Sequence, residues 1–249
     1  MISLKKWLSV SVSLATGSIL FAEEAASYSG KVSIVKMYNE GGEFMPIIAG
    51  LGVIVILMAI VKTFRLSIKE KFDAKNFYLK LKGYIKNQQY DEVQKICSNF
   101  KDKTLGFIFW NGFITFNDAR KSGIKGKELK EVLENAFEEA AMQKIPEIEA
   151  GLFWFDVFGQ VATLMGLLGT IFGLVQSFDA LGNAPESEKS KLLTSGISTA
   201  MGTTAFGLVV AIPTMFIKGG LQVKAKKIVN QVDEYSVKMI NQVSNSLGE

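Results

Sequence analysis

The chain has 249 residues, and apolar residues make up 48 % of them, a high share for a soluble protein of this length. Its formal net charge is +4, but the charges form no patch of their own, so no nucleic-acid partner is expected. The sequence has no histidine and one cysteine, Cys97, which excludes histidine-based catalysis, histidine metal sites and an internal disulfide framework.

The first 22 residues have the form of a secretory signal peptide. Lys5 and Lys6 precede a short apolar stretch, and Ala22 stands directly before two acidic residues, so cleavage is expected after Ala22. The alternative is an uncleaved first membrane anchor. With cleavage, residues 23–43 form the amino-terminal segment of the mature chain.

Three apolar runs are each close to the roughly 20 residues that a helix needs to cross a bilayer. They predict transmembrane helices over residues 44–61, 152–178 and 192–217. Pro46 suits the first turn of the first helix, where a missing amide hydrogen costs nothing. The sequence thus predicts an integral membrane protein with three spans.

The charges between the runs predict how the chain is oriented. Residues 62–151 hold 17 Lys or Arg against 13 Asp or Glu, and residues 218–249 hold 5 against 3. Residues 23–45 hold 2 against 4, and residues 179–191 hold 2 against 3. By the positive-inside rule, the middle segment and the carboxy terminus are cytoplasmic, whereas the amino-terminal segment and the loop 179–191 lie outside.

The cytoplasmic domain, residues 62–151, is predicted to be all-helical. Two short helices flank a turn at "KNQQ", with apolar residues three and four positions apart, at Phe77, Leu81, Tyr84 and Ile85, and at Val93, Ile96, Cys97 and Phe100. A long amphipathic helix follows, bent or broken near Pro146, and is expected to run straight into the second span. Residues 218–249 predict a further amphipathic helix. The predicted fold class is an all-α integral membrane protein whose long helices extend into the cytoplasmic domain.

Small residues recur along the second and third spans. Because lipid provides no hydrophobic drive between helices, close packing there depends on small residues. Such stripes predict tight contacts, either within the chain or with a neighbouring subunit. The predicted packing positions are Gly166, Gly169 and Gly173, and Gly196, Ala200, Gly207 and Pro213.

Hydroxyl side chains accompany these small residues and predict a polar strip. They are Thr163, Thr170 and Ser177, spaced seven apart on one face of the second span, and Thr199, Thr203 and Thr204 in the third. Neither residues 157–178 nor residues 192–217 include an Asp, Glu, His, Lys or Arg. Since a proton relay normally needs a titratable group in the membrane, any proton that crosses here requires an acid from a partner.

Two stretches carry a family resemblance. "ATLMGLLGTIFGLVQSF" and "GISTAMGTTAFGLVVAIP" resemble the paired signatures of the ExbB/TolQ/MotA proton-channel family, most closely its ExbB/TolQ branch. The resemblance implies a bacterial inner-membrane subunit, not an enzyme and without cofactor or metal, that forms a pentamer around an ExbD-like dimer. In this family the membrane Asp of the single-span partner carries protons, and threonines at the positions of Thr170 and Thr204 line the pore. The proton flow drives a TonB-like protein.

Two positions depart from the family pattern, and three other roles stay open. The ExbB and TolQ branches often carry Glu at the position of Thr199 and Pro at that of Thr163. The missing Glu argues against any scheme in which this subunit supplies a titratable group, and it leaves Thr170 and Thr204 intact. The alternatives are a TolQ-like subunit for envelope maintenance, a MotA-like stator subunit and a passive membrane scaffold. A solute permease is disfavoured, because the sequence has no inverted repeat.

Overall fold

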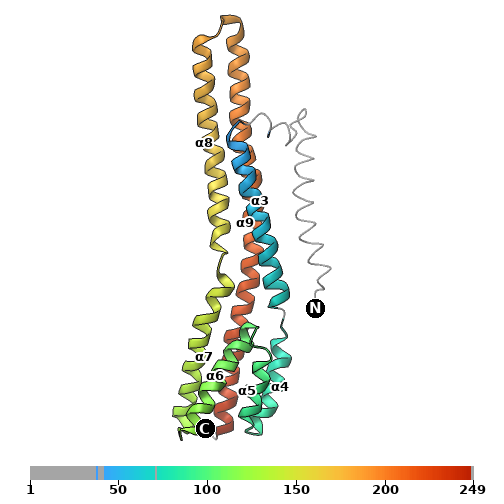
Figure 1. Ribbon diagram of the computed structural model, residues 1–249, viewed down its shortest axis with the longest axis vertical. Helices are drawn as coiled ribbons and strands as arrows, with labels where there is room; N and C mark the ends of the chain where they lie inside the picture. Colours follow the sequence, from blue (N-terminus) through green and yellow to red (C-terminus); the bar gives the residue numbers. More distant parts are fainter. Residues whose placement is uncertain (1–37, 39–41, 71, 248–249) are drawn as a thin grey trace. The chain divides into compact units, whose positions relative to one another are not determined.

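The computed structural model describes Tyr38 and residues 42–70 and 72–247; the predicted signal peptide lies outside these ranges. Their regular elements are helices, labelled in Figure 1. They are α3 (Phe44–Phe64), the π-helical turn η1 (Arg65–Lys69), α4 (Ala74–Lys86), α5 (Tyr90–Ser98), α6 (Thr104–Lys121), α7 (Gly126–Glu149), α8 (Phe153–Asn183) and α9 (Glu186–Leu247). No strand occurs in the described ranges, which confirms the predicted all-α class.

Three stretches of helix are long and apolar enough to cross a membrane, as predicted. The first is α3, which continues into η1, the second includes α8, and the third is α9. At 62 residues, α9 comprises both the predicted third span and the amphipathic segment after it, with Pro213 inside the helix. The third span therefore continues without interruption into the carboxy-terminal helix.

The connection between α7 and α8 differs from the prediction of one continuous helix. α7 passes through Pro146 and ends at Glu149, and α8 begins at Phe153. Between them Gly151 has a φ of +79°, a left-handed conformation that favours glycine and ends helices. The break near Pro146 is therefore present, but a glycine turn causes it rather than the proline.

The segment 179–191, assigned to a loop from its charges, is almost entirely helical. α8 extends to Asn183 and α9 begins at Glu186, so Ala184 and Pro185 alone separate them. Charge and polarity indicated where the membrane run stops, but they carry no signal against a helix that continues beyond it. The side of the membrane on which this segment lies stays a prediction.

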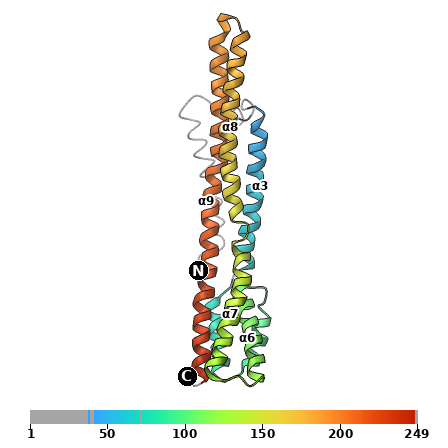
Figure 2. The same cartoon turned by 90° about the vertical axis from the view of Figure 1, so that its left-hand side faces the viewer.

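The chain divides into two compact units, and each is described by itself. The membrane unit comprises Met1–Leu57 and Trp154–Ile217, of which Tyr38, residues 42–57 and 154–217 are described. In it α8 lies beside the first half of α9, as Figures 1 and 2 show. A small core cluster joins α3 to these helices through Met45, Ile48, Ala162 and Phe206.

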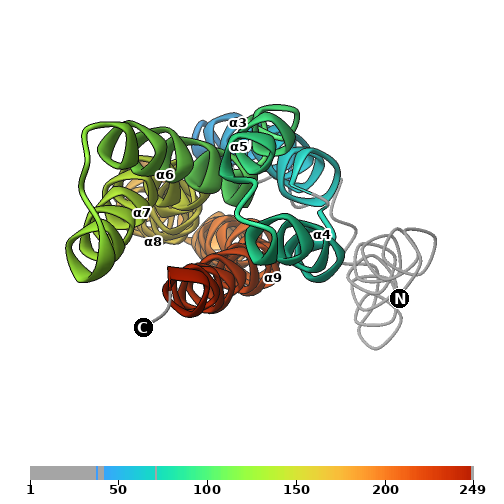
Figure 3. The same cartoon turned by 90° about the horizontal axis from the view of Figure 1, so that it is seen from below.

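The helical unit comprises Met58–Phe153 and Lys218–Glu249. Figure 3 shows α4, α5, α6, α7 and the second half of α9 end-on. Its core is rich in aromatic side chains; the rings of Phe109 and Phe137, for example, stack with centroids 5.1 Å apart. The two short helices predicted around "KNQQ" are α4 and α5, and their buried residues include Phe77, Leu81, Val93 and Cys97.

Candidate functional site in the membrane unit

α8 and α9 approach each other at backbone distance where glycines face each other. A Cβ atom added to Gly207 would lie 2.6 Å from the carbonyl oxygen of Ala162, and one added to Gly166 would lie 3.1 Å from that of Thr203. Real Cβ atoms do not approach backbone oxygen as closely as 2.6 Å, so Gly207 cannot be enlarged without moving a helix. This contact fixes how α8 and α9 lie against each other.

The other small residues follow the same α8–α9 contact. A Cβ on Gly173 would meet that of Ala200 at 3.0 Å, while Gly169 faces the side chain of Thr203 and Gly196 faces Ser177. Pro213 lies within α9 and is half-buried. These glycines therefore serve packing within one chain, and contact with a neighbouring subunit stays a prediction.

The hydroxyl groups of Thr170 and Thr204 touch each other across the α8–α9 contact. The Thr170 hydroxyl also lies 3.1 Å from the carbonyl oxygen of Ala200, and the Thr204 hydroxyl lies 3.0 Å from that of Gly166. Each hydroxyl has one proton to donate, so the pair can form a chain that ends at either carbonyl. Both residues are half-buried in the single chain.

The remaining hydroxyls of the predicted strip mostly bond within their own helices. Thr163 donates to Gly159 at 3.1 Å, Ser177 donates to Gly173 at 2.6 Å, and Thr203 donates to Thr199 at 3.0 Å, in each case to the carbonyl oxygen. Thr199 is half-buried. The structure thus brings Thr170 and Thr204 together, whereas Thr163 and Ser177 bond to their own helix.

One hydroxyl of this unit was not singled out from the sequence. Thr214 is 1 % exposed, donates to the carbonyl oxygen of Val210 at 2.7 Å, and lies in ordinary contact with the position of Gly159. Its spacing of eleven residues from Thr203, about three helical turns, would have placed it on the same helix face as that residue. Because its hydroxyl is buried and donates to its own helix, Thr214 serves as a control position for the hydroxyls of the strip.

The site contains no group that titrates near neutral pH. Thr170 and Thr204 can donate and accept hydrogen bonds, but they do not carry a charge. Among the described residues, no cluster of three or more Cys, Asp or Glu side chains could hold a metal ion. The arrangement can therefore polarise or solvate a proton path and cannot by itself bind the proton.

Comparison with known proteins finds a matching family model and several relatives. Residues 113–234 match the model of the MotA/TolQ/ExbB proton channel family. The biopolymer transport protein exbB1 of Vibrio cholerae is 35 % identical over 69 residues, and a putative biopolymer transport protein, ExbB-like 3, of Synechocystis is 40 % identical over 82 residues. The Tol-Pal system protein TolQ of Pseudomonas aeruginosa is 25 % identical over 150 residues.

These matches cover only part of this chain and only part of each relative. They cover 28 %, 32 % and 58 % of this chain, and 30 %, 39 % and 64 % of the respective relatives. The chain thus spans less than two thirds of the length of each. The family model includes all of α8 and the membrane half of α9, where the paired motifs and the contacting threonines lie. On this match, together with three membrane helices and these relatives, residues 113–234 are assigned to the MotA/TolQ/ExbB proton channel family.

Proposed function

We propose that this chain is the pore-forming subunit of a proton-driven motor in the bacterial inner membrane, with a periplasmic amino terminus and a cytoplasmic carboxy terminus. The observation that carries the proposal is the contact between the Thr170 and Thr204 hydroxyls in spans without a titratable side chain. Such a strip lines a proton path, while the proton itself needs an acid from another chain. Thr199, Thr163 and Ser177 extend the proposed path.

The proposed acid is the membrane Asp of a small ExbD-like single-span subunit, present as a dimer inside a pentamer of this chain. Apolar side chains that remain exposed on both helices support an assembly in the bilayer. They include Leu164, Leu167, Ile171 and Val175 on α8 and Met201, Leu208, Ile212 and Met215 on α9. Such surfaces are stable against lipid or against other membrane helices.

The proposed recipient of the work is a TonB-like periplasm-spanning protein that serves transport through the outer membrane. Two of the relatives bear the name biopolymer transport protein, which favours this role. The third bears the name Tol-Pal system protein, which favours a TolQ-like role in the envelope. A MotA-like stator role would share the same pore and differ in the partner that is driven.

The decisive experiment combines co-purification with proton flux. The chain is expressed with its candidate single-span partner, the complex is weighed by native mass spectrometry, and flux is measured in proteoliposomes. We expect Thr170→Val and Thr204→Val to lower flux at least about tenfold, which corresponds to about 1.4 kcal/mol of barrier, with an unchanged complex mass. Thr214→Val is the matched control, because its hydroxyl is buried and bonded within α9.

Two results would contradict the proposal. Unaltered flux in both threonine variants would remove the hydroxyl pair from the path. Failure to recover any partner with a membrane Asp would favour a passive scaffold, in which the same glycine contacts cluster helices and no ion crosses.

A further inference from the structure

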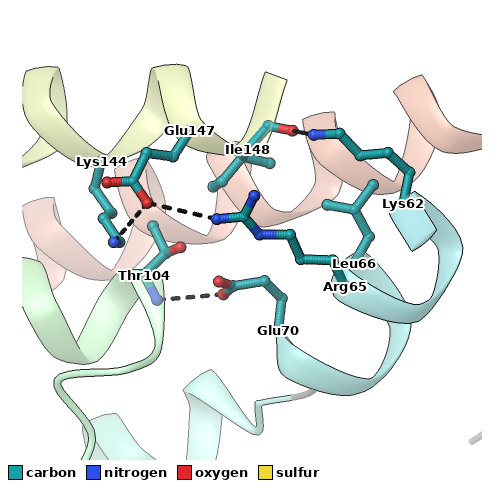
Figure 4. Close-up of a pocket in the computed structure, with 8 residues that line it drawn as sticks. All are labelled: Lys62, Arg65, Leu66, Glu70, Thr104, Lys144, Glu147 and Ile148. Atoms are coloured by element: carbon teal, nitrogen blue, oxygen red, sulfur yellow. Dashed lines mark hydrogen bonds and ion pairs between the residues drawn. The ribbon is translucent and has the colours of Figure 1, made fainter. Parts of the chain in front are cut away.

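A charged pocket lies in the helical unit, where three segments of chain converge (Figure 4). It is lined by Lys62, Arg65 and Glu70 around η1, by Thr104 at the start of α6, and by Lys144 and Glu147 near the end of α7. We call it the basic pocket. The π-helical turn η1 follows α3 directly, and turns of this kind often occur at functional positions.

The two carboxylates of the basic pocket already have partners. Glu147 accepts a hydrogen bond from Lys144 at 2.7 Å, and Glu70 accepts one from the backbone N–H of Thr104 at 3.2 Å. Glu70 therefore neutralises the amino-terminal end of α6. Lys144 and Arg65 thus share the Glu147 carboxylate, at 2.7 and 4.0 Å.

Lys62 and Arg65 are the incompletely paired cations of the pocket. The Lys62 ammonium donates to the carbonyl oxygen of Ile148 at 3.4 Å, and the Arg65 guanidinium lies 4.0 Å from the Glu147 carboxylate that Lys144 already holds. Three cations face two carboxylates in this pocket, so it carries one net positive charge. A guanidinium has five N–H donors, most of which remain for another acceptor.

Thr104 supplies a second observation that points to a ligand. The residue is 1 % exposed, and its hydroxyl has no hydrogen-bond partner within the part of the chain that the structure describes. In Figure 4 its side chain points into the space between Arg65, Glu70 and Glu147. A buried hydroxyl without a partner is destabilising, whereas a bound oxyanion would accept its hydrogen bond.

The position of the basic pocket along the chain indicates the source of such an oxyanion. Lys62 follows directly after the apolar run that ends at Val61, and Arg65 comes one helical turn later. Basic residues just beyond a membrane span lie at the depth of the lipid phosphates, on whichever side the span ends. Arg pairs with phosphate oxygens through parallel N–H groups.

We propose that the basic pocket binds a singly charged phosphate group, that of an anionic phospholipid headgroup, with Lys62 and Arg65 on its oxygens and the Thr104 hydroxyl donating to one of them. The charge of a phosphodiester matches the excess of one cation. This proposal requires only that the chain spans a membrane, and it stands whether or not the chain conducts protons.

The test is a lipid titration of the full-length chain in neutral detergent. The thermal unfolding midpoint is followed against phosphatidylglycerol, zwitterionic phosphatidylcholine and inorganic phosphate. We expect phosphatidylglycerol to raise the midpoint, and we expect Arg65→Gln and Thr104→Val each to weaken its apparent affinity about tenfold. Lys127→Gln removes the same charge from an exposed position on α7 outside the pocket and should leave the affinity unchanged.

Each outcome decides the proposal. Stabilisation by inorganic phosphate alone, lost in the same variants, would support the pocket with a soluble phosphate as its ligand. Equal effects of both lipids, or equal affinity in wild type, Arg65→Gln and Thr104→Val, would overturn it. A Thr104→Val variant that unfolds earlier without lipid but binds phosphatidylglycerol normally would assign the hydroxyl a structural role and would also overturn it.

Discussion

The membrane unit and the helical unit hold their helices together by opposite means. The helical unit buries large rings: Phe109, Phe113, Phe116 and Phe137 are each at most 2 % exposed. The membrane unit instead removes side chains where α8 meets α9, so that backbones touch at Gly166 and Gly207. Burial of apolar area drives association in water but not in lipid, where close contact must provide the attraction.

The two units also differ in whether their buried polar side-chain atoms have hydrogen-bond partners. Side-chain atoms of Thr104, Asn117 and Ser236 lack a hydrogen-bond partner, and all three residues lie in the helical unit. In the described membrane unit, buried hydroxyls such as those of Ser177 and Thr214 donate to a carbonyl of their own helix. The bilayer core offers no water as a substitute partner, so a buried hydroxyl in the membrane unit has to bond within the protein.

The largest loss of stability is expected from removing one ring from the aromatic core of the helical unit. Phe137→Ala removes a ring that stacks on Phe109 and packs edge-on against Phe113, and we expect it to lower the free energy of unfolding of the helical unit by about 3–5 kcal/mol. Chemical denaturation followed by circular dichroism measures this. Leu79→Ala, at a half-exposed position on α4, should cost less than about 1 kcal/mol; equal losses would contradict the role of the ring cluster.

The next largest effect is expected from adding one methyl group to the contact between α8 and α9. Gly207→Ala forces a Cβ against the carbonyl oxygen of Ala162, and we expect a loss of about 1–3 kcal/mol, measured as a lower unfolding midpoint in detergent. Gly202→Ala is matched to it, since it lies in the same helix with no atom within 4 Å of the added carbon. That control should be neutral or stabilising, and a loss as large as that of Gly207→Ala would remove the contact as the cause.

Periodicity was sufficient to predict most of the fold. The apolar spacing located α4 and α5, and the apolar runs located the three spans. It missed the turn at Gly151, because a positive φ is a property of one residue and leaves no mark on the hydrophobic pattern around it. It predicted a further amphipathic helix over residues 218–249, and the structure adds that this helix continues the third span through Gly219 and Gly220 without a break.

The site was predictable in its residues and not in its contacts. Spacing placed Thr170 on the same helix face as Gly166 and Gly173, which lie against α9 in the structure. That Thr170 and Thr204 touch depends on the relative register of two helices, which no single-helix pattern encodes. The basic pocket could not be predicted from the sequence either, because Lys62, Thr104 and Lys144 come from three segments that lie far apart in the sequence.

A smaller loss of stability is expected from a substitution at Gly151, in the turn that follows α7. Gly151→Ala places a Cβ at a φ of +79°, and we expect a loss of about 1 kcal/mol in the free energy of unfolding. Gly182→Ala, in α8 with open space around it and no positive φ, should instead be neutral or gain up to about 1 kcal/mol. Calorimetry of both variants under one condition measures the difference, and the same sign for both would argue against a backbone requirement at Gly151.

The last prediction leaves the sequence unchanged and concerns the thiol of Cys97, which is fully buried in the helical unit. Burial raises the pKa of this thiol, so at neutral pH it stays protonated, and the thiolate is the form that reacts with alkylating reagents. We expect iodoacetamide to label the native chain at least about a hundredfold more slowly than the denatured chain, because labelling requires the core to open. Phe137→Ala should speed native labelling and Gly207→Ala should not, since only the first weakens the unit that holds Cys97; labelling at the denatured rate in the native wild-type chain would place this thiol outside a stable core.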